Sequence, residues 1–286
     1  MAGKFPPKYI GAVMSGQALG GIFPAVVDLI VVGANIKAKN TGFACFLIAT
    51  LVLIGSFLSF SFVRHSLFYK FYSGDLPTDS ASTSSDEVEV IRPRPSISLI
   101  VKRSWEYLLA VWVVFTTTLT VFPAITVLVE SEHASNPAST VTTPHTRWAD
   151  DYFTPVTCFL LFNVGDYAGR QLASVIQRPG SSARGRVFVV AVSVLRVGFI
   201  PLFLFCNAAP NSRTIPVVFA HDWMYVVFMA VFALSNGYLG NLAMLHGPKI
   251  FEEAEYQEAA AMVLVAFLVL GTSAGSALSY PLVSLL

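Results

Sequence analysis

Charged residues are scarce in this chain. Asp, Glu, Lys and Arg together make up 12% of its 286 residues, well below the ~25% of ordinary soluble domains. Hydrophobic residues make up 55%, and the mean hydropathy is +0.65. This composition excludes an ordinary soluble domain and predicts an all-α integral membrane protein. A net charge of only +1 also excludes the strongly basic surface expected of a nucleic-acid-binding protein.

Signatures of catalysis and of cofactor binding are also missing. No Walker P-loop occurs, so we expect no ATP-driven pumping. The three cysteines fall in different hydrophobic runs and the five histidines show no ligand spacing, so neither a disulfide framework nor a metal site is predicted. Gly271-x-Ser273-x-Gly275 matches the nucleophile elbow of hydrolases, but that motif needs a strand–turn–helix context and here lies within a hydrophobic run. We therefore expect neither an enzyme nor a bound cofactor or metal.

The hydrophobic residues gather into runs of roughly 20, the length that an α-helix needs to cross the hydrocarbon core of a bilayer. We predict seven transmembrane helices, at residues 9–33, 42–63, 105–129, 153–176, 187–207, 222–246 and 259–284. The polar stretch between the second and third helices has a composition typical of disorder. The chain then divides into two helices in residues 1–72, a disordered cytosolic linker in 73–104 and a five-helix bundle in 105–286.

The distribution of lysine and arginine predicts the orientation of these helices. With a cytosolic amino terminus, 12 of the 18 basic residues lie on the cytosolic side, four lie on the opposite side, and Arg170 and Arg196 lie within the membrane. Seven helices then place the carboxyl terminus outside the cell or in a lumen. A seven-helix receptor of the rhodopsin type has the opposite orientation, so this function is disfavoured.

Two opposite charges lie inside the fourth hydrophobic run. Asp166 and Arg170 are one helical turn apart, so both side chains lie on one helix face and each partly neutralises the other. Charges inside a membrane are costly and usually face a bundle interior or an aqueous cavity on a substrate path. Asn163, one turn earlier, adds a hydrogen-bond donor and an acceptor. This face is a candidate site for a polar solute, and a buried ion pair that only fixes helix packing is the alternative.

Several sequence motifs together resemble the equilibrative nucleoside transporter family. They are MSGQALGGIF in the first hydrophobic run, TVFPAITV at the end of the third, FNVGDYAGRQLASV in the fourth, LRVGFIPLFLFCN in the fifth and ALSNGYLGNLAMLHGPK in the sixth. The resemblance covers nearly the whole chain. It implies a membrane transporter that moves nucleosides by facilitated diffusion and alternating access without ATP, and it leaves transport of nucleobases open.

Members of this family resemble an eleven-helix transporter of major-facilitator-like architecture, with six helices in one half and five in the other. This chain resembles the part that starts at the family's fifth helix. The resemblance therefore implies a chain truncated at its amino terminus, with a partial major-facilitator-like fold made of two helices of the first half and the complete second half. A non-transporting regulatory or pseudo-transporter fragment, which associates with a full-length transporter, is the alternative function.

The resemblance and the chemistry of the side chains together imply roles in substrate binding. Asp166 is expected to accept hydrogen bonds from ribose hydroxyls, and Arg170 to donate to ribose oxygens. The amide of Asn163 could read a base edge. Phe159, one turn before Asn163, and Phe122 are candidate aromatic walls for the base, and ordinary packing is an equal alternative for both.

Four more polar residues are candidates for a role in transport. Gln17 lies in a stretch of small residues that favours close helix packing, and its amide fits either packing or a cavity-facing position. Arg196 needs a partner, for which Asp166 or a loop carboxylate is a candidate, and we expect it to act in structure or gating. Asp28 and Glu258 resemble acidic residues of the endosomal–lysosomal family member. Both are candidate proton sensors, because a low dielectric raises the pKa of a carboxyl. The lysosomal or late endosomal membrane and the plasma membrane are the two expected locations.

Overall fold

A computed structural model of the chain describes residues 7–34, 38–67, 69–70, 95–134, 146–210 and 213–286. These residues are mainly helical, and their only β-type pairing consists of two isolated bridges. The long helices are α1 (Pro7–Gly33), α2 (Ala38–Arg64), α4 (Ile97–Val121), α5 (Leu161–Val175), α6 (Ala183–Leu195), α8 (Asp222–His246) and α9 (Ala254–Val283), and α7 (Phe199–Leu204) is short.

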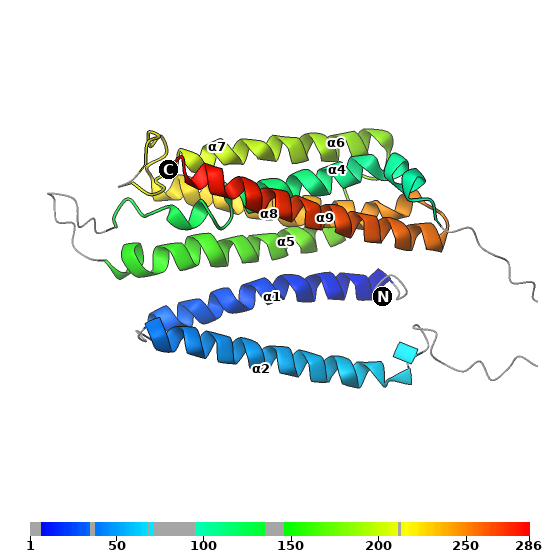
Figure 1. Cartoon of the computed structure of the whole chain (residues 1–286), viewed down its shortest axis with the longest axis horizontal. Coiled ribbons are helices and arrows are strands. Elements are labelled where there is room, and N and C mark those ends of the chain that lie inside the picture. Colours follow the sequence, from blue (N-terminus) through cyan, green and yellow to red (C-terminus); the bar gives the residue numbers. More distant parts are fainter. Residues whose placement is uncertain (1–6, 35–37, 68, 71–94, 135–145, 211–212) are drawn as a thin grey trace, which may run out of the picture.

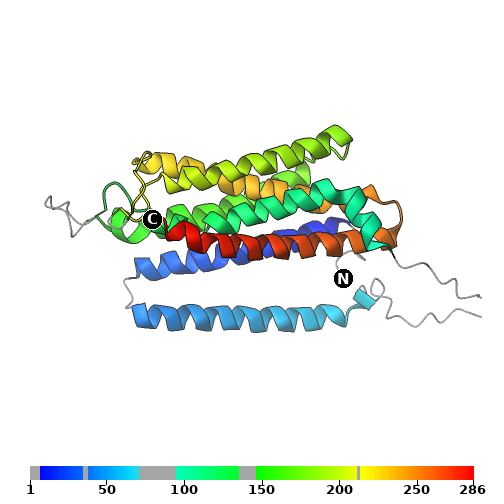
Figure 2. The ribbon, with the colours of Figure 1, turned by 45° about the horizontal axis from the view of Figure 1, so that its top comes forward.

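Helices α4 to α9 pack side by side into one bundle, and α1 and α2 form a hairpin beside it (Figures 1 and 2). Helix α1 of the hairpin packs against α5 of the bundle. Helix α2 packs against α1 and lies farthest from the bundle. Helix α1 begins at one end of the bundle, and α9 ends at the other (Figure 1).

Five described segments are long and apolar enough to cross a membrane. They are Phe46–Arg64, Ile97–Leu128, Ala183–Leu204, Asp222–Ile250 and Ala254–Val283. The apolar part of α1, Leu19–Gly33, is shorter, and α5 carries charged side chains. The chain is therefore a multi-pass helical membrane protein, as its composition predicts. The count of seven transmembrane helices stays a prediction.

The third predicted helix begins earlier than the hydrophobic pattern indicates. Helix α4 starts at Ile97, so the last residues of the predicted linker are helical, whereas residues 71–94 lie outside the described part of the chain. Ser104 departs from helical geometry, with φ −114° and ψ 15°. A short segment with Lys102 and Arg103 thus precedes this kink and the hydrophobic part follows it, which is why hydropathy alone placed the start at residue 105.

The fourth and fifth predicted helices each consist of several helical pieces. The fourth begins with two π-helical turns, η3 (Trp148–Tyr152) and η4 (Pro155–Leu160), and continues into α5. The fifth joins α6 to α7 through the 3₁₀ turn η5 (Arg196–Gly198). Such local departures from α-helical geometry often mark functional sites. The two π-helical turns precede Asp166 and Arg170 along the chain, and the 3₁₀ turn begins with Arg196.

The helices differ in how much of their surface other helices cover. Tyr107, Val111 and Val114 of α4 are 0% exposed, whereas Phe46 and Phe62 of α2 are 78% and 85% exposed. A soluble monomer rarely exposes so much contiguous apolar surface. In a bilayer this surface faces hydrocarbon, so the exposure agrees with a location in the membrane.

Candidate functional site

The two charges predicted to share a helix face form an ion pair on α5. The Arg170 Nε donates to the Asp166 Oδ2 at 2.8 Å, and the side chains are 18% and 10% exposed, respectively. Because both side chains are mostly buried, this interaction is screened less than one on a surface. The Arg170 side chain of the pair nevertheless remains partly accessible to solvent.

Helix α8 supplies a second partner for the carboxylate. The Asn236 Nδ2 donates to the Asp166 Oδ1 at 2.6 Å, so each carboxylate oxygen accepts a hydrogen bond from a different residue. The amide nitrogen of Asn236 must face Asp166, since a carboxylate only accepts. Asn236 was not singled out from the sequence, although it precedes Gly237 in the ALSNGYLGN motif.

Glycines allow α5 and α8 to approach closely at this point. A Cβ on Gly237 would overlap the backbone oxygen of Asp166 and lie 2.9 Å from the backbone nitrogen of Arg170. A Cβ on Gly169 would overlap the backbone oxygen of Leu234. Small residues at such crossings bring helix backbones together in membranes. Here the close approach brings the Asn236 amide within reach of Asp166.

A buried arginine lies on the other side of Asn236. Arg196 is 1% exposed, and its Nη1 donates to the backbone oxygen of Phe232 at 2.8 Å. Its Nη2 donates to the Thr118 Oγ1 at 3.0 Å, and this oxygen lies 2.7 Å from the Asn236 Oδ1. A polar network therefore connects Arg196, Thr118, Asn236 and the Asp166–Arg170 pair across helices α4, α5 and α8 and the turn η5.

The partners of Arg196 differ from those expected from the sequence. No described carboxylate forms an ion pair with it, and its hydrogen bonds go to neutral oxygens, including Ser235 Oγ. The ring of Phe232 also lies 4.7 Å from its guanidinium carbon, a cation–π arrangement. Arg196 thus reaches Asp166 only through Asn236, whose Oδ1 lies 3.5 Å from the Arg196 Nη2. The expected direct pairing with Asp166 is not formed, and a role in structure or gating stays a prediction.

Three aromatic side chains, from the end of α4, from η4 and from the start of α5, gather near the beginning of α5. Phe122 follows α4 and stacks on Phe162 of α5, with ring centroids 3.8 Å apart and planes 13° apart. Phe159 meets Phe122 edge to face at 6.1 Å. The structure therefore brings together the two phenylalanines that were predicted as aromatic walls. It adds Phe162, which lies four residues before Asp166 and could have been found from that spacing.

The structure places Asn163 against α1. Its Nδ2 donates to the backbone oxygen of Phe159 at 2.8 Å, and a Cβ on Gly21 would overlap its Oδ1. Asn163 thus helps to join α1 to α5, and its role as a reader of base edges stays a prediction. The side chain of Gln17 lies outside the described part of the structure.

The two candidate proton sensors lie at opposite ends of the bundle. Asp28 is near the end of α1 and half-buried, whereas Glu258 is exposed near the start of α9. In Figure 1 the end of α1 and the start of α9 are far apart. These two carboxyls therefore cannot share one proton, and any role in pH sensing would be separate for each.

Comparisons with known proteins match the same family that the sequence motifs resemble. The sequence model of a family described as "Nucleoside transporter" matches residues 1–284. Equilibrative nucleoside transporter 1 of Rattus norvegicus is 35% identical over 302 residues and member 2 of Homo sapiens is 31% identical over 314 residues. Member 3 of Rattus norvegicus is 32% identical over 291 residues. These alignments include 98%, 97% and 97% of this chain.

The chain spans less than two thirds of the length of these relatives. The alignments cover 63%, 65% and 58% of members 1, 2 and 3. The activity of a complete relative is therefore a hypothesis for this chain. The identities of 35% to member 1 and 32% to member 3 do not by themselves indicate a particular membrane compartment.

Proposed function

The chain belongs to the nucleoside transporter family, and from this premise we propose that it binds nucleosides and moves them across a membrane by facilitated diffusion. The relatives that support this proposal carry the name equilibrative nucleoside transporter. In this proposal the chain needs no ATP, and it exposes one site alternately to the two sides of the membrane.

The observation that carries this proposal is the Asp166–Arg170 pair, held across the α5–α8 crossing by Asn236. A ribose hydroxyl can donate to a carboxylate and can accept from a guanidinium. Adjacent hydroxyls of one sugar could therefore contact Asp166 and Arg170 at the same time. Asn236 fixes the orientation of the carboxylate, and Arg170 remains partly accessible, as a binding group must.

The aromatic side chains near Asp166 suit the base of a nucleoside. Phe122 and Phe159 would pack against the faces of the base, and aromatic stacking is tolerant of base identity because every base has a π-face. Asn163 would add a hydrogen bond to a base edge, which offers both donors and acceptors. This arrangement favours nucleosides over free sugars, and nucleobases, which lack ribose, would use only the aromatic part.

We further propose that seven helices cross the membrane in a partial major-facilitator-like arrangement, with the amino terminus in the cytosol. The distribution of basic residues supports this orientation. A lysosomal, late endosomal or plasma membrane would each accommodate such a protein. Gln17 stays a candidate binding residue, because it belongs to α1 and α1 packs against α5.

A second candidate function is a non-transporting regulatory protein that associates with a full-length transporter. The observation that favours it is the exposure of α2, whose span Phe46–Arg64 has no fully buried side chain among the described residues. Another transporter chain could cover this surface as well as lipid could. In this case the chain alone would bind or transport little nucleoside.

Uptake of radiolabelled uridine into proteoliposomes tests the proposal. We expect saturable uptake that reaches equilibrium without ATP and that unlabelled adenosine or uridine inhibits. Asp166→Asn and Arg170→Lys should reduce this uptake at least about tenfold, because each removes a charge-assisted or bidentate hydrogen bond. Asp151→Asn is the matched control, since it removes an exposed carboxylate that lies 4.0 Å from Arg147 at the same i,i+4 spacing.

Absence of uptake by a well-folded chain would contradict transport by this chain alone. If the chain then changed uptake by a co-reconstituted equilibrative nucleoside transporter 1, the regulatory function would replace the first proposal. Unchanged uptake in Asp166→Asn would remove the ion pair from the substrate site.

We also propose Asp28 as a separate site for pH dependence of transport. It is a half-buried carboxyl on α1, and α1 packs against η3 and α5. Of these two elements, η3 carries Asp150 and Asp151, and α5 carries the Asp166–Arg170 pair. Asp28→Asn should flatten the dependence of uptake on external pH, and a pH profile equal to that of the wild type would exclude this role.

A further inference from the structure

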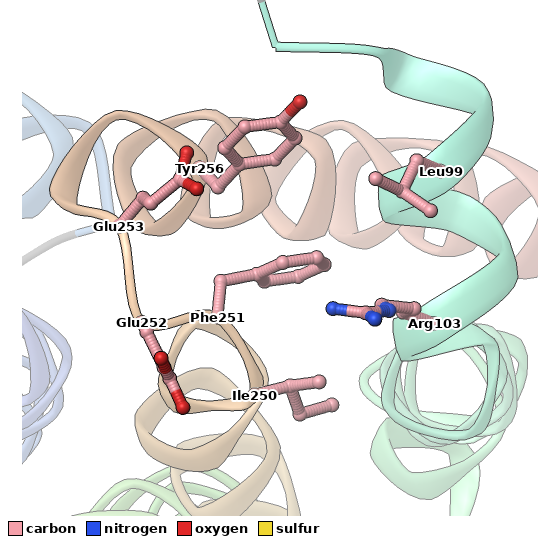
Figure 3. A pocket seen from close by; sticks show the side chains of 7 residues that line it. All are labelled: Leu99, Arg103, Ile250, Phe251, Glu252, Glu253 and Tyr256. Carbon is pink, nitrogen blue, oxygen red and sulfur yellow. The ribbon is translucent and has the colours of Figure 1, made fainter.

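A pocket opens at the end of the bundle where α4 and α9 begin (Figure 3). Its volume is about 240 Å³, which exceeds the ~30 Å³ share of a single water molecule but is below the ~300–1,000 Å³ typical of sites for drug-sized ligands. The pocket is lined by Leu99, Arg103, Ile250, Phe251, Glu252, Glu253 and Tyr256. None of these residues belongs to the Asp166–Arg170 site.

Opposite charges lie on opposite sides of this pocket. Arg103 extends from α4 toward the ring of Phe251, while Glu252 and Glu253 lie beyond that ring on the chain that leads into α9 (Figure 3). No residue that the structure describes forms an ion pair with Arg103 or with either glutamate. The pocket therefore offers a cation and two carboxylates that do not neutralise one another.

The floor between these charges is held in place by packing and by hydrogen bonds. Phe251 is 4% exposed, and it packs in a small cluster with Ile100 and Ala260. The ring of Tyr256 stacks on it, with centroids 5.8 Å apart and planes 20° apart. The Gln257 Nε2 also donates to the backbone oxygen of Phe251 at 2.7 Å. The charged groups thus surround a preformed aromatic floor.

The position of the pocket indicates a ligand that comes from the bilayer. The two segments that meet beside it, Ile97–Leu128 and Ala254–Val283, are long and apolar enough to span a membrane, and the pocket lies at their first residues. Ile97 and Leu99 are 67% and 39% exposed on α4 next to Arg103. An arginine at the first residues of such a segment suits the polar headgroup region, and the exposed apolar side chains suit the acyl chains.

We propose that this pocket binds the headgroup of a zwitterionic phospholipid that ends in a primary ammonium, as in phosphatidylethanolamine. Arg103 binds the phosphate, because a guanidinium matches phosphate oxygens in geometry and charge. The ammonium, with three N–H donors, lies against the ring of Tyr256, which stacks on the buried Phe251, and donates to Glu252 or Glu253. The proposal concerns a site distinct from the nucleoside site and does not depend on transport.

The charges of the pocket select this headgroup over the other common ones. The lining carries one positive and two negative side chains, so an anionic headgroup without an ammonium would leave both glutamates facing its negative charge. A choline headgroup has no N–H donor for the carboxylates, although its cation can still lie over the ring. The expected order of affinity is phosphatidylethanolamine, then phosphatidylcholine, then phosphatidylglycerol.

Titration of the purified full chain with single lipids, followed by native mass spectrometry and by thermal unfolding in detergent, tests the proposal. We expect phosphatidylethanolamine to bind at least about tenfold more tightly than phosphatidylglycerol. Arg103→Gln should weaken this binding about tenfold or more, because it removes a charge-assisted bond to phosphate. Lys102→Gln, which changes the adjacent basic residue outside the pocket lining, is the matched control and should leave the affinity unchanged.

The glutamates give an independent variant that preserves the floor. Glu252→Gln with Glu253→Gln should reduce the preference for phosphatidylethanolamine over phosphatidylcholine, while both lipids still bind. Equal affinity of all three lipids, or unchanged affinity in a folded Arg103→Gln variant, would overturn the proposal. Binding of soluble glycerophosphoethanolamine as tightly as the lipid would overturn the bilayer as the source of the ligand.

Discussion

Two helix crossings in this protein are built by the same device but carry different chemistry. At the α5–α8 crossing, a Cβ on Gly169 or Gly237 would overlap the backbone of the partner helix. At the α4–α9 crossing, a Cβ on Gly275 would overlap the backbone oxygen of Thr116, and one on Gly271 would lie 2.8 Å from that of Trp112. In both places, glycine lets two helices approach closely.

The polar groups beside these glycines distinguish the two crossings. The α4–α9 crossing has threonine hydroxyls that lie near glycine carbonyls, with the Thr116 Oγ1 3.2 Å from the oxygen of Gly271. The α5–α8 crossing has an ion pair and an amide, which are much costlier to bury in a membrane. Close packing alone therefore does not require Asp166, Arg170 or Asn236. We infer that the α4–α9 crossing is structural and propose that the α5–α8 crossing serves the substrate.

Removal of the carboxylate should have the largest effect. Asp166→Leu leaves the mostly buried Arg170 without this counter-ion and Asn236 without its acceptor, so we expect a loss of about 3–5 kcal/mol in the free energy of unfolding. The double variant Asp166→Leu/Arg170→Met should recover much of this loss, because an apolar pair avoids the desolvation penalty. Unfolding in detergent and uridine binding should be measured on both variants.

The double variant separates packing from function. If the ion pair serves the substrate, the double variant is stable but binds uridine at least about tenfold more weakly than the wild type, since the charge-assisted hydrogen bonds are gone. If the double variant recovered uridine binding together with stability, the α5–α8 crossing would be structural as well.

A methyl group at either crossing should have an intermediate effect. Gly237→Ala and Gly275→Ala each place a Cβ against a backbone oxygen, so each should lower the free energy of unfolding by about 1–3 kcal/mol. Only Gly237→Ala should also weaken uridine binding by the folded protein, because only this Cβ moves the backbone of Asp166. Equal weakening of uridine binding by both variants would remove the distinction between the crossings.

Two threonines on α4 should give the smallest effects, and they should differ. Thr116→Val removes a hydroxyl that contacts Gly271, at a cost of ~0.6 kcal/mol, the average for hydrogen bonds between membrane helices. Thr118→Val removes the hydroxyl that links Arg196 to Asn236 and should cost ~1 kcal/mol or more. Uridine affinity should fall in the second variant alone, and a fall in the first would contradict a purely structural α4–α9 crossing.

The sequence predicted those features that depend on local spacing. The i,i+4 spacing of Asp166 and Arg170 predicted one shared helix face, and the two side chains form an ion pair there. Asn236 is 70 positions from Asp166, and no local pattern indicates which residue of another helix will meet a carboxylate. For the same reason Arg196 was expected to need an acid, whereas its partners are neutral oxygens of α4 and α8.

Helix boundaries were less predictable where charged residues lie inside the first turns of a helix. Helix α4 begins at Ile97, eight residues before the predicted start at residue 105, because hydropathy does not register a helical turn that contains Lys102 and Arg103. Hydropathy likewise does not distinguish the covered α4 from the exposed α2, since both are apolar around much of their circumference. In a membrane both the lipid and the interior of a helix bundle are apolar, so an apolar pattern does not report which helices pack together.

Binding of uridine and of 2′,3′-dideoxyuridine to the wild type and to Asp166→Asn tests the central claim most directly. The two ligands differ only in the ribose hydroxyls that Asp166 is proposed to bind, so the four affinities form a double-mutant cycle. We predict that the wild type prefers uridine by about tenfold or more and that Asp166→Asn loses most of this preference. An equal preference for uridine in both folded proteins would contradict the claim that Asp166 binds ribose.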